Sequence, residues 1–136
     1  ISDPSATGEI LGPKLFAEFA RPHLDRMVRA MRRAGAPVIV HICGDVSPIY
    51  GPLAELDADA ISVDSVVSPP HVKRMLGGRR VMGNVSTLLL QDGTPERIRE
   101  VSKHLVESGV DILAPACGVS ATTPVENLRA MTEAVR

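Results

Sequence analysis

His41, Cys43 and Cys117 are the residues of this chain whose types and spacing point most directly to chemistry. The chain contains two cysteines and four histidines, and His41 and Cys43 are separated by a single residue. Thiolate sulfur and imidazole nitrogen are ligands that zinc prefers, and a catalytic zinc has three protein ligands and one open position. If the β-rich runs before the two cysteines are neighbouring strands of one sheet, residues 74 positions apart can meet at a single ion, and the sequence predicts one zinc site.

Each of the three residues also has an ordinary structural interpretation. A cysteine outside a disulfide is typical of a small buried hydrophobic residue, and a histidine at the end of a strand is usually structural. Two observations favour a metal site. Residues i and i+2 of a strand point to the same side, so His41 and Cys43 can face one point. Both cysteines follow β-rich runs and precede a glycine. From spacing alone, both interpretations stay open.

The elements that must position these residues are four short β-rich runs separated by helical patterns. The runs are mostly continuously apolar, as expected for strands covered on both faces. They span residues 38–42, 60–64, 81–85 and 111–115. This alternation predicts an α/β fold, with one helix followed by four βα units in a parallel sheet with right-handed crossovers.

Three helices have clear sequence signals. Before the first strand, Pro22 is expected to start a new helix or kink the existing one. The expected buried stripe there consists of Phe16, Phe19, Leu24, Met27, Val28 and Met31. A later helix is expected to begin at Thr94-Pro95, and its expected buried face consists of Ile98, Val101, Leu105 and Val106.

The last helix is predicted to open with a capping box between Thr123 and Glu126. Its expected buried residues are Leu128, Met131 and Val135.

Polar residues fall at the carboxyl ends of the predicted strands, where parallel α/β folds place their active sites. Asp64 ends the second run, and could be a labile fourth metal ligand or a hydrogen-bond partner that orients His41. A helix cap or an ordinary loop acid is an equally open interpretation of Asp64. Asn84, after Gly83, could be a turn residue or could equally hydrogen-bond a bound ligand. We interpret the other polar candidates, which are Asp45, His23, His71 and His104, as a helix cap and three surface residues.

Composition excludes several classes of function. The net charge is −1 with acids and bases interspersed, which argues against a nucleic-acid-binding protein with its concentrated basic face. No apolar run approaches the roughly 20 residues of a membrane span. Two cysteines in an otherwise ordinary chain favour a reduced, cytoplasmic protein. At 136 residues and 44% apolar content, the chain can form one folded domain.

Five segments, in this order, resemble the uroporphyrinogen decarboxylase superfamily. They are His-Ile-Cys-Gly-Asp (41–45), Ile-Ser-Val-Asp (61–64), Met-Gly-Asn-Val (82–85), Leu-Ala-Pro-Ala-Cys-Gly (113–118) and Thr-Thr-Pro-Val-Glu-Asn-Leu (122–128). More narrowly, they resemble its zinc-dependent branch, the methylcobamide:coenzyme M methyltransferases. The specific part of the resemblance is His-x-Cys followed by the distant Cys-Gly.

The resemblance implies a fold and an activity. Family members are (β/α)8 TIM barrels, so residues 1–136 are expected to form a single domain, the C-terminal half of a barrel with about four strands. The resemblance implies that His41, Cys43 and Cys117 bind zinc, and that Asp64 stands where a carboxylate can approach the metal. We take Asp64 and Asn84 as the candidate catalytic residues. The methyltransferases commonly have glutamate at the position of Asp64, and usually glycine at that of Ala116. The implied reaction moves a methyl group from a methyl-corrinoid, on a partner protein or as methylcobalamin, to a zinc-bound thiol such as coenzyme M.

Two other classes of function stay open. A decarboxylase-like enzyme of porphyrin biosynthesis would use no metal, and those enzymes carry a histidine near the position of Cys117. A non-catalytic α/β binding module would simply bury its thiols. Because four strands cannot close a barrel, we expect either a homodimer of two half-barrels or a truncated chain, and a start at Ile1 suits the latter.

Overall fold

The computed structural model describes residues 1–135, whose strands form one parallel sheet in the order β1-β2-β3-β4-β5. The strands are β1 (Ser2–Asp3), β2 (Ile39–Ile42), β3 (Ala60–Val63), β4 (Arg80–Val85) and β5 (Ile112–Pro115). The helices before β3 are α1 (Gly8–Leu15), the π-helical turn η1 (Phe16–Ala20), α2 (Arg21–Arg33), the 3-10 turn η2 (Ser47–Ile49) and α3 (Tyr50–Ala54). Those after β3 are α4 (Pro69–Met75), α5 (Thr87–Asp92), α6 (Pro95–Glu107) and α7 (Val125–Glu133).

The order of the strands in the sheet is their order in the chain, so every crossover leads to the neighbouring strand. His41 of β2 pairs with Ser62 of β3, and Asn84 of β4 pairs with Ala114 of β5. Since all strands are parallel, their carboxyl ends lie at one edge of the sheet. The predicted α/β class with parallel βα units is therefore confirmed.

The four predicted strands lie within one residue of their expected limits, but the structure adds β1 in front of them. The prediction that a helix comes first was wrong. The two residues of β1 are too few to show the alternation of apolar and polar residues that predicts a strand. Pairing with β2 holds β1 in place. The His41 amide donates to the Ile1 carbonyl at 2.8 Å, and the Ile1 ammonium donates to the Ile39 carbonyl at 2.9 Å.

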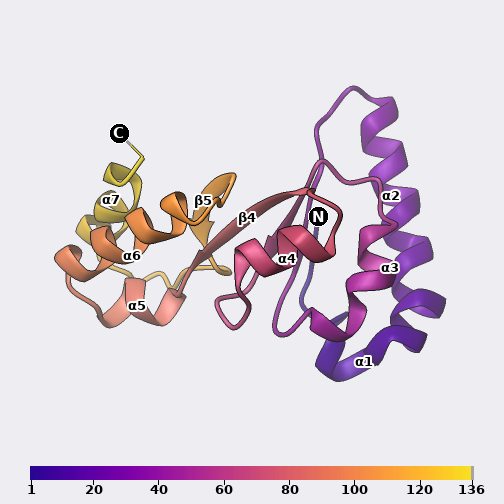
Figure 1. The fold of residues 1–136 in the computed structure, drawn as a ribbon, viewed down its shortest axis with the longest axis horizontal. Coiled ribbons are helices and arrows are strands. Elements are labelled where there is room, and N and C mark those ends of the chain that lie inside the picture. The colour runs from indigo at the N-terminus through magenta and orange to yellow at the C-terminus, as the bar shows by residue number, and fades with distance from the viewer. Residues whose placement is uncertain (136) are drawn as a thin grey trace.

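Buried hydrophobic residues form two clusters that meet along β4. The larger cluster lies between α1–α4 and the first four strands and includes Val81, whereas the smaller one lies under α5, α6 and α7 and includes Val85. Figure 1 shows α1, α2 and α3 on one side of the molecule and α5, α6 and α7 on the other, with β4 and α4 between them. β4 thus fixes the position of the β5 end of the sheet relative to the rest.

The first helical region differs in part from its expected buried stripe. Pro22 lies in the first turn of α2, as predicted, and Phe16, Leu24 and Val28 are buried. Phe19, Met27 and Met31, in contrast, are 59%, 42% and 44% exposed. The buried residues repeat at steps of four and eight. Each exposed residue lies three positions after a buried one, and this offset turns its side chain toward the flank of the helical region.

The start of α6 was predicted correctly, whereas the predicted cap of α7 was wrong. The Thr94 hydroxyl accepts from the Arg97 amide at the start of α6, as expected, and Ile98 is buried, although Val106 is 36% exposed. The predicted capping box of α7 does not form. The cap of α7 is Pro124, and the Thr123 hydroxyl donates instead to Gln91 Oε1 at 3.2 Å.

Past the end of α7, Val135 is 58% exposed rather than buried, whereas Met131 is buried as expected. The helix ends at Glu133, so Val135 no longer follows the helical period on which the prediction relied.

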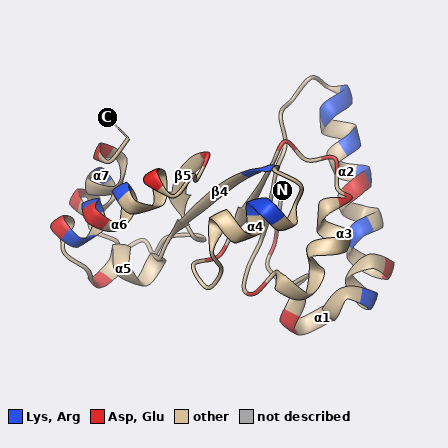
Figure 2. Cartoon of the chain, viewed as in Figure 1, with Lys and Arg blue, Asp and Glu red and all other residues tan. Residues whose placement is uncertain are grey.

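Charged residues of both signs are spread over the helices (Figure 2). Some join neighbouring elements, such as Arg99 of α6 with Glu133 of α7 at 2.9 Å. No helix within residues 1–135 is both long enough and apolar enough to cross a membrane.

Candidate metal centre

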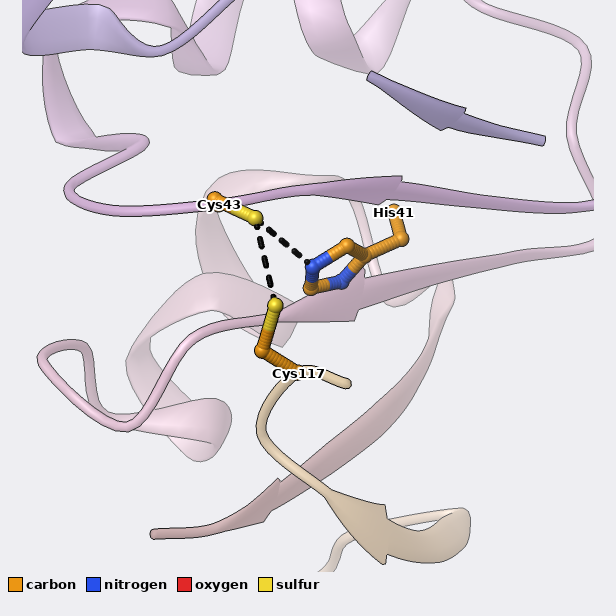
Figure 3. A group of neighbouring side chains, drawn as sticks. All are labelled: His41, Cys43 and Cys117. Atoms are coloured by element: carbon orange, nitrogen blue, oxygen red, sulfur yellow. Dashed lines mark hydrogen bonds between the residues drawn. The ribbon is translucent and has the colours of Figure 1, made fainter. Parts of the chain in front are cut away.

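The side chains of His41, Cys43 and Cys117 converge at the carboxyl edge of the sheet. His41 lies in β2, Cys43 is the first residue after β2, and Cys117 lies two residues past the end of β5. His41 Nε2 is 3.2 Å from Cys43 Sγ, and Cys43 Sγ is 3.4 Å from Cys117 Sγ. Figure 3 shows the three side chains pointing toward one another. The fold thus brings the three residues together, although β3 and β4 lie between β2 and β5, so the expectation that the two runs are neighbouring strands was wrong.

One nitrogen and two sulfur atoms, each offered by a different residue, lie within 4.8 Å of one another. This donor set matches the Cys2His ligation of catalytic zinc sites, which leaves a fourth position for another ligand. Cys43 is partly buried and Cys117 is exposed, so a small molecule can approach the sulfur atoms from solvent. The residues therefore fit a zinc ion with an accessible fourth position.

The imidazole of His41 contacts Ser62, a residue that the sequence analysis did not single out. Ser62 Oγ lies 3.0 Å from His41 Nδ1, on the side of the ring opposite the sulfur atoms. Ser62 lies on β3, directly opposite His41 in the parallel register. Only the strand register reveals this contact, and a single sequence does not determine the register.

Asp64 lies just after β3 and contacts the loop that carries Cys43, rather than the imidazole. Its Oδ2 accepts from the Gly44 amide at 3.1 Å, and its Oδ1 accepts from the Ser65 hydroxyl at 3.2 Å. Gly44 has φ +68°, a conformation that glycine adopts at little cost. Asp64 thus fixes the turn immediately after Cys43, and its role as a metal ligand stays a prediction.

Asn84 is buried at the end of β4 and ties down the turn that contains Asp64. Its Nδ2 donates to the Asp64 carbonyl and to the Val67 carbonyl, both at 2.8 Å. Gly83 before it has φ +134°, and a side chain there would meet the Val63 carbonyl at 2.9 Å. Asn84 thus lies within β4 and is not itself a turn residue, and its side chain stabilises the turn at residues 64–67 instead.

Burial sets the protonation of the site. It lowers the pKa of His41 below its usual value, so the ring is neutral at neutral pH. Burial also raises the pKa of the Cys43 thiol to about 11, assisted by its hydrogen bond to Cys117 and by the charges of Cys117, Asp64 and Asp3. Cys43 in the metal-free site is therefore a protonated thiol. A bound cation would have to displace that proton.

The remaining polar candidates lie outside the cluster. His23, His71 and His104 are exposed, as expected. Asp45 Oδ1 accepts from the Ser47 amide at 2.8 Å just before η2. The cap of η2 is Val46, without a side-chain cap hydrogen bond, so the prediction that Asp45 caps the next helix was wrong.

The model of the family described as uroporphyrinogen decarboxylase (URO-D) matches residues 1–136. The chain belongs to this family. Among its curated relatives, the methylcobamide:CoM methyltransferase MtbA of Methanosarcina acetivorans is 31% identical over all of this chain and 40% of its own length. The methylated-thiol–coenzyme M methyltransferase of Methanosarcina mazei is 32% identical over all of this chain and 36% of its own length. A uroporphyrinogen decarboxylase of Thermus thermophilus is 28% identical over 93% of this chain and 38% of its own length.

A solved structure, described as a methyltransferase from Methanosarcina mazei, matches this fold with a TM-score of 0.89 and 33% identity. The match covers 98% of this chain and 40% of the other chain. The predicted membership of the uroporphyrinogen decarboxylase family is confirmed, as is a half-barrel fold, although with five strands rather than about four. Within that family, the chain is similar to methyltransferases, as predicted. The chain spans only 36–40% of the relatives that we compare.

Proposed function

We propose that this chain supplies the zinc-binding part of an enzyme that moves a methyl group from a methyl-corrinoid to a small thiol such as coenzyme M. The observation that carries the proposal is the convergence of His41 Nε2 and the two cysteine Sγ atoms within 4.8 Å. The methyltransferase relatives are named after methylcobamide and coenzyme M, and these names support the choice of methyl donor and thiol acceptor.

In this proposal, His41, Cys43 and Cys117 would hold the ion. Zinc, when bound, would lower the pKa of a coordinated substrate thiol and hold the resulting thiolate near the methyl donor. His41 contributes a neutral ligand, and the two cysteine thiolates balance the charge of the dication. A substrate sulfur at this site therefore keeps its electron density and its nucleophilicity.

Asp64 and Asn84 would act on the ligands rather than on the methyl group. Asn84 fixes the 64–67 turn, and Asp64 then fixes the Gly44 amide one residue from Cys43. Together they set the position of the Cys43 sulfur relative to the other donors. Asp64 lies outside the three donors that converge within 4.8 Å, and it would be a weak fourth ligand that substrate displaces.

The corrinoid would be presented either by a partner protein or as free methylcobalamin, at the carboxyl edge of the sheet. Both sheet edges, β1 and β5, have free pairing positions in the described structure, and open edges favour association with another strand. We therefore expect turnover to require a completed barrel, built from two copies or from further chain. Zinc binding, in contrast, requires only the residues described above.

The test is zinc stoichiometry in the purified protein and in single variants. We expect one zinc per chain in the wild type, and loss of tight binding in Cys43→Ala, Cys117→Ala and His41→Ala. His71→Ala is the matched histidine control, because His71 is exposed and belongs to α4. Tight zinc binding in both cysteine variants would contradict the proposal.

Methyl transfer from methylcobalamin to a thiol then tests the activity itself. Methylated thiol and demethylated corrinoid should form in equal amounts if the barrel is complete. The similarity to uroporphyrinogen decarboxylases leaves a metal-independent alternative. That alternative predicts tight binding of a carboxylate-rich tetrapyrrole with no zinc in the protein, and the two assays together separate the two functions.

A further inference from the structure

Ser62 makes a contact with His41 that is more specific than ordinary packing in a sheet. Its Oγ lies 3.0 Å from His41 Nδ1, and the residue is only 5% exposed. The two residues are direct partners in the pairing of β2 with β3, so the backbone fixes the distance between them. The contact is therefore built into the sheet and does not depend on a mobile loop.

The imidazole ring has one nitrogen toward Ser62 and the other toward the sulfur atoms. His41 Nε2 is 3.2 Å from Cys43 Sγ, whereas Nδ1 faces Ser62. Turning the ring over would exchange a nitrogen for a carbon at both places and lose both contacts. The bond to Ser62 thus selects Nε2 as the nitrogen that is presented to an ion.

We propose that Ser62 is a positioning residue of the metal centre, which fixes the orientation of the His41 ring. This inference rests on the proposed function, because it assumes that His41 binds zinc. A hydroxyl can donate and can accept, so it suits both states of the ring. In the metal-free site it can donate to Nδ1 while Nε2–H points at Cys43 Sγ. With an ion at Nε2, the proton lies on Nδ1 and is donated to Ser62 Oγ.

A neutral hydrogen-bond partner for His41 suits the charges that the two thiolates and a metal ion would bring to the site. Histidines that bind metals usually donate their second N–H to a carboxylate, a carbonyl or a water. Here the nearby carboxylate of Asp64 is directed to Gly44 and Ser65 instead. Two thiolates already balance a dication, and the serine adds no further negative charge near a substrate that must itself become a thiolate.

A purely structural role for Ser62 is the alternative, and the chain offers a matched control for it. Ser102 in α6 is fully buried, and its hydroxyl has no hydrogen-bond partner within the described residues. Ser102→Ala removes a buried hydroxyl as Ser62→Ala does, but from a helix that carries none of the three proposed ligands. Ser62→Thr keeps a hydroxyl at the position and serves as the conservative variant.

The experiment measures zinc affinity by chelator competition in the wild type and in Ser62→Ala, Ser62→Thr and Ser102→Ala. We expect Ser62→Ala to weaken zinc binding by about 10- to 100-fold, the usual effect of removing such a partner. Ser62→Thr should recover most of the affinity, and Ser102→Ala should leave it unchanged. Circular dichroism and thermal unfolding of the metal-free proteins verify that each variant is folded.

Nuclear magnetic resonance of the His41 ring gives a second readout that packing alone would not change. In the zinc-loaded wild type, Nδ1 should carry a proton that exchanges slowly with solvent, and this exchange should accelerate in Ser62→Ala. Wild-type protein without tight zinc would contradict the metal centre and, with it, this inference. A folded Ser62→Ala protein with wild-type zinc affinity and slow Nδ1 exchange would overturn the role of Ser62 alone.

Discussion

Cys43 Sγ lies 3.4 Å from Cys117 Sγ, although 74 positions separate the two residues and two strands lie between theirs in the sheet. In a flat sheet, β2 and β5 would be three strand spacings apart, or about 14 Å. The contact therefore requires the sheet to curl, as the wall of a barrel does. The curvature brings together ligands that the strand order alone would keep apart.

The same contact predicts how the metal-free protein reacts with a mild oxidant. Treatment with one equivalent of hydrogen peroxide should join Cys43 and Cys117 in an intramolecular disulfide, while the peroxide is reduced to two waters. Bound zinc should slow this reaction, because both sulfur atoms would then be ligands. Thiol titration and intact mass, with and without zinc, measure the effect. Formation of disulfide-linked dimers as the main product would contradict the prediction.

Zinc affinity should rise with pH through the neutral range. The pKa of Cys43 is raised to about 11, so its thiol must release a proton when the ion binds. The pKa of His41 is lowered, so its ring is already neutral and releases none. Cys43 alone therefore contributes about one log unit of affinity for each pH unit. Chelator competition between pH 6.5 and 8.5 measures the slope, and a flat profile would exclude Cys43 as a ligand.

The sequence contained most of the fold, because four continuously apolar runs and the helical periods between them are strong local signals. It did not reveal β1, whose two residues owe their conformation to pairing with β2. It also assigned Thr123 to a helix cap, whereas its hydroxyl bonds Gln91 from another element. Both differences arise from contacts between distant segments, which no local pattern records.

Some residues of the candidate site could likewise be predicted from the sequence, whereas contacts between distant segments could not. His41, Cys43 and Cys117 could be proposed because their residue types are rare in this chain and suited to one ion. Ser62 could not, because a serine in a strand is unremarkable until the register places it opposite His41. Asp64 was a candidate partner for the imidazole, but the geometry of the loop directs its carboxylate to Gly44.

Asp59 should stabilise the fold at neutral pH and lose this effect in acid. Its Oδ2 accepts from the Val38 amide at 2.7 Å and its Oδ1 accepts from Arg32 at 2.9 Å, which joins α2 to the start of β2. The hydrogen bond from Val38 and the charge of Arg32 lower the pKa of Asp59. The stabilisation is thus complete above the usual carboxyl pKa of about 4 and disappears as the pH falls through the lower folded value.

The measurement is urea unfolding of the wild type and Asp59→Asn at pH 7 and at pH 2.5. The variant should be less stable at pH 7, and the difference should shrink in acid. Asp57→Asn is the control, because Asp57 is exposed and its carboxylate pairs only with Arg32, at 3.3 Å, within the described residues. An Asp59→Asn effect of equal size at both pH values would show that the charge of this carboxylate is irrelevant.

A comparison of Asn84 with Asn127 tests whether the turn at residues 64–67 affects the metal centre. Each donates its side-chain amide to two backbone carbonyls, those of Asp64 and Val67 for Asn84 and those of Leu90 and Gly93 for Asn127. Replacement of either by alanine leaves carbonyl groups unpaired, so each variant should lose about 1–3 kcal/mol of unfolding free energy.

Only Asn84→Ala should also weaken zinc binding, because the turn that it fixes carries Asp64, which fixes the Gly44 amide beside Cys43. The turn fixed by Asn127 follows α5 and has no hydrogen bond to the metal centre in the described structure. Thermal unfolding of the metal-free variants and chelator competition provide the two measurements. Equal zinc affinities in Asn84→Ala and Asn127→Ala, at equal losses of stability, would break the proposed connection from Asn84 through Asp64 to Cys43.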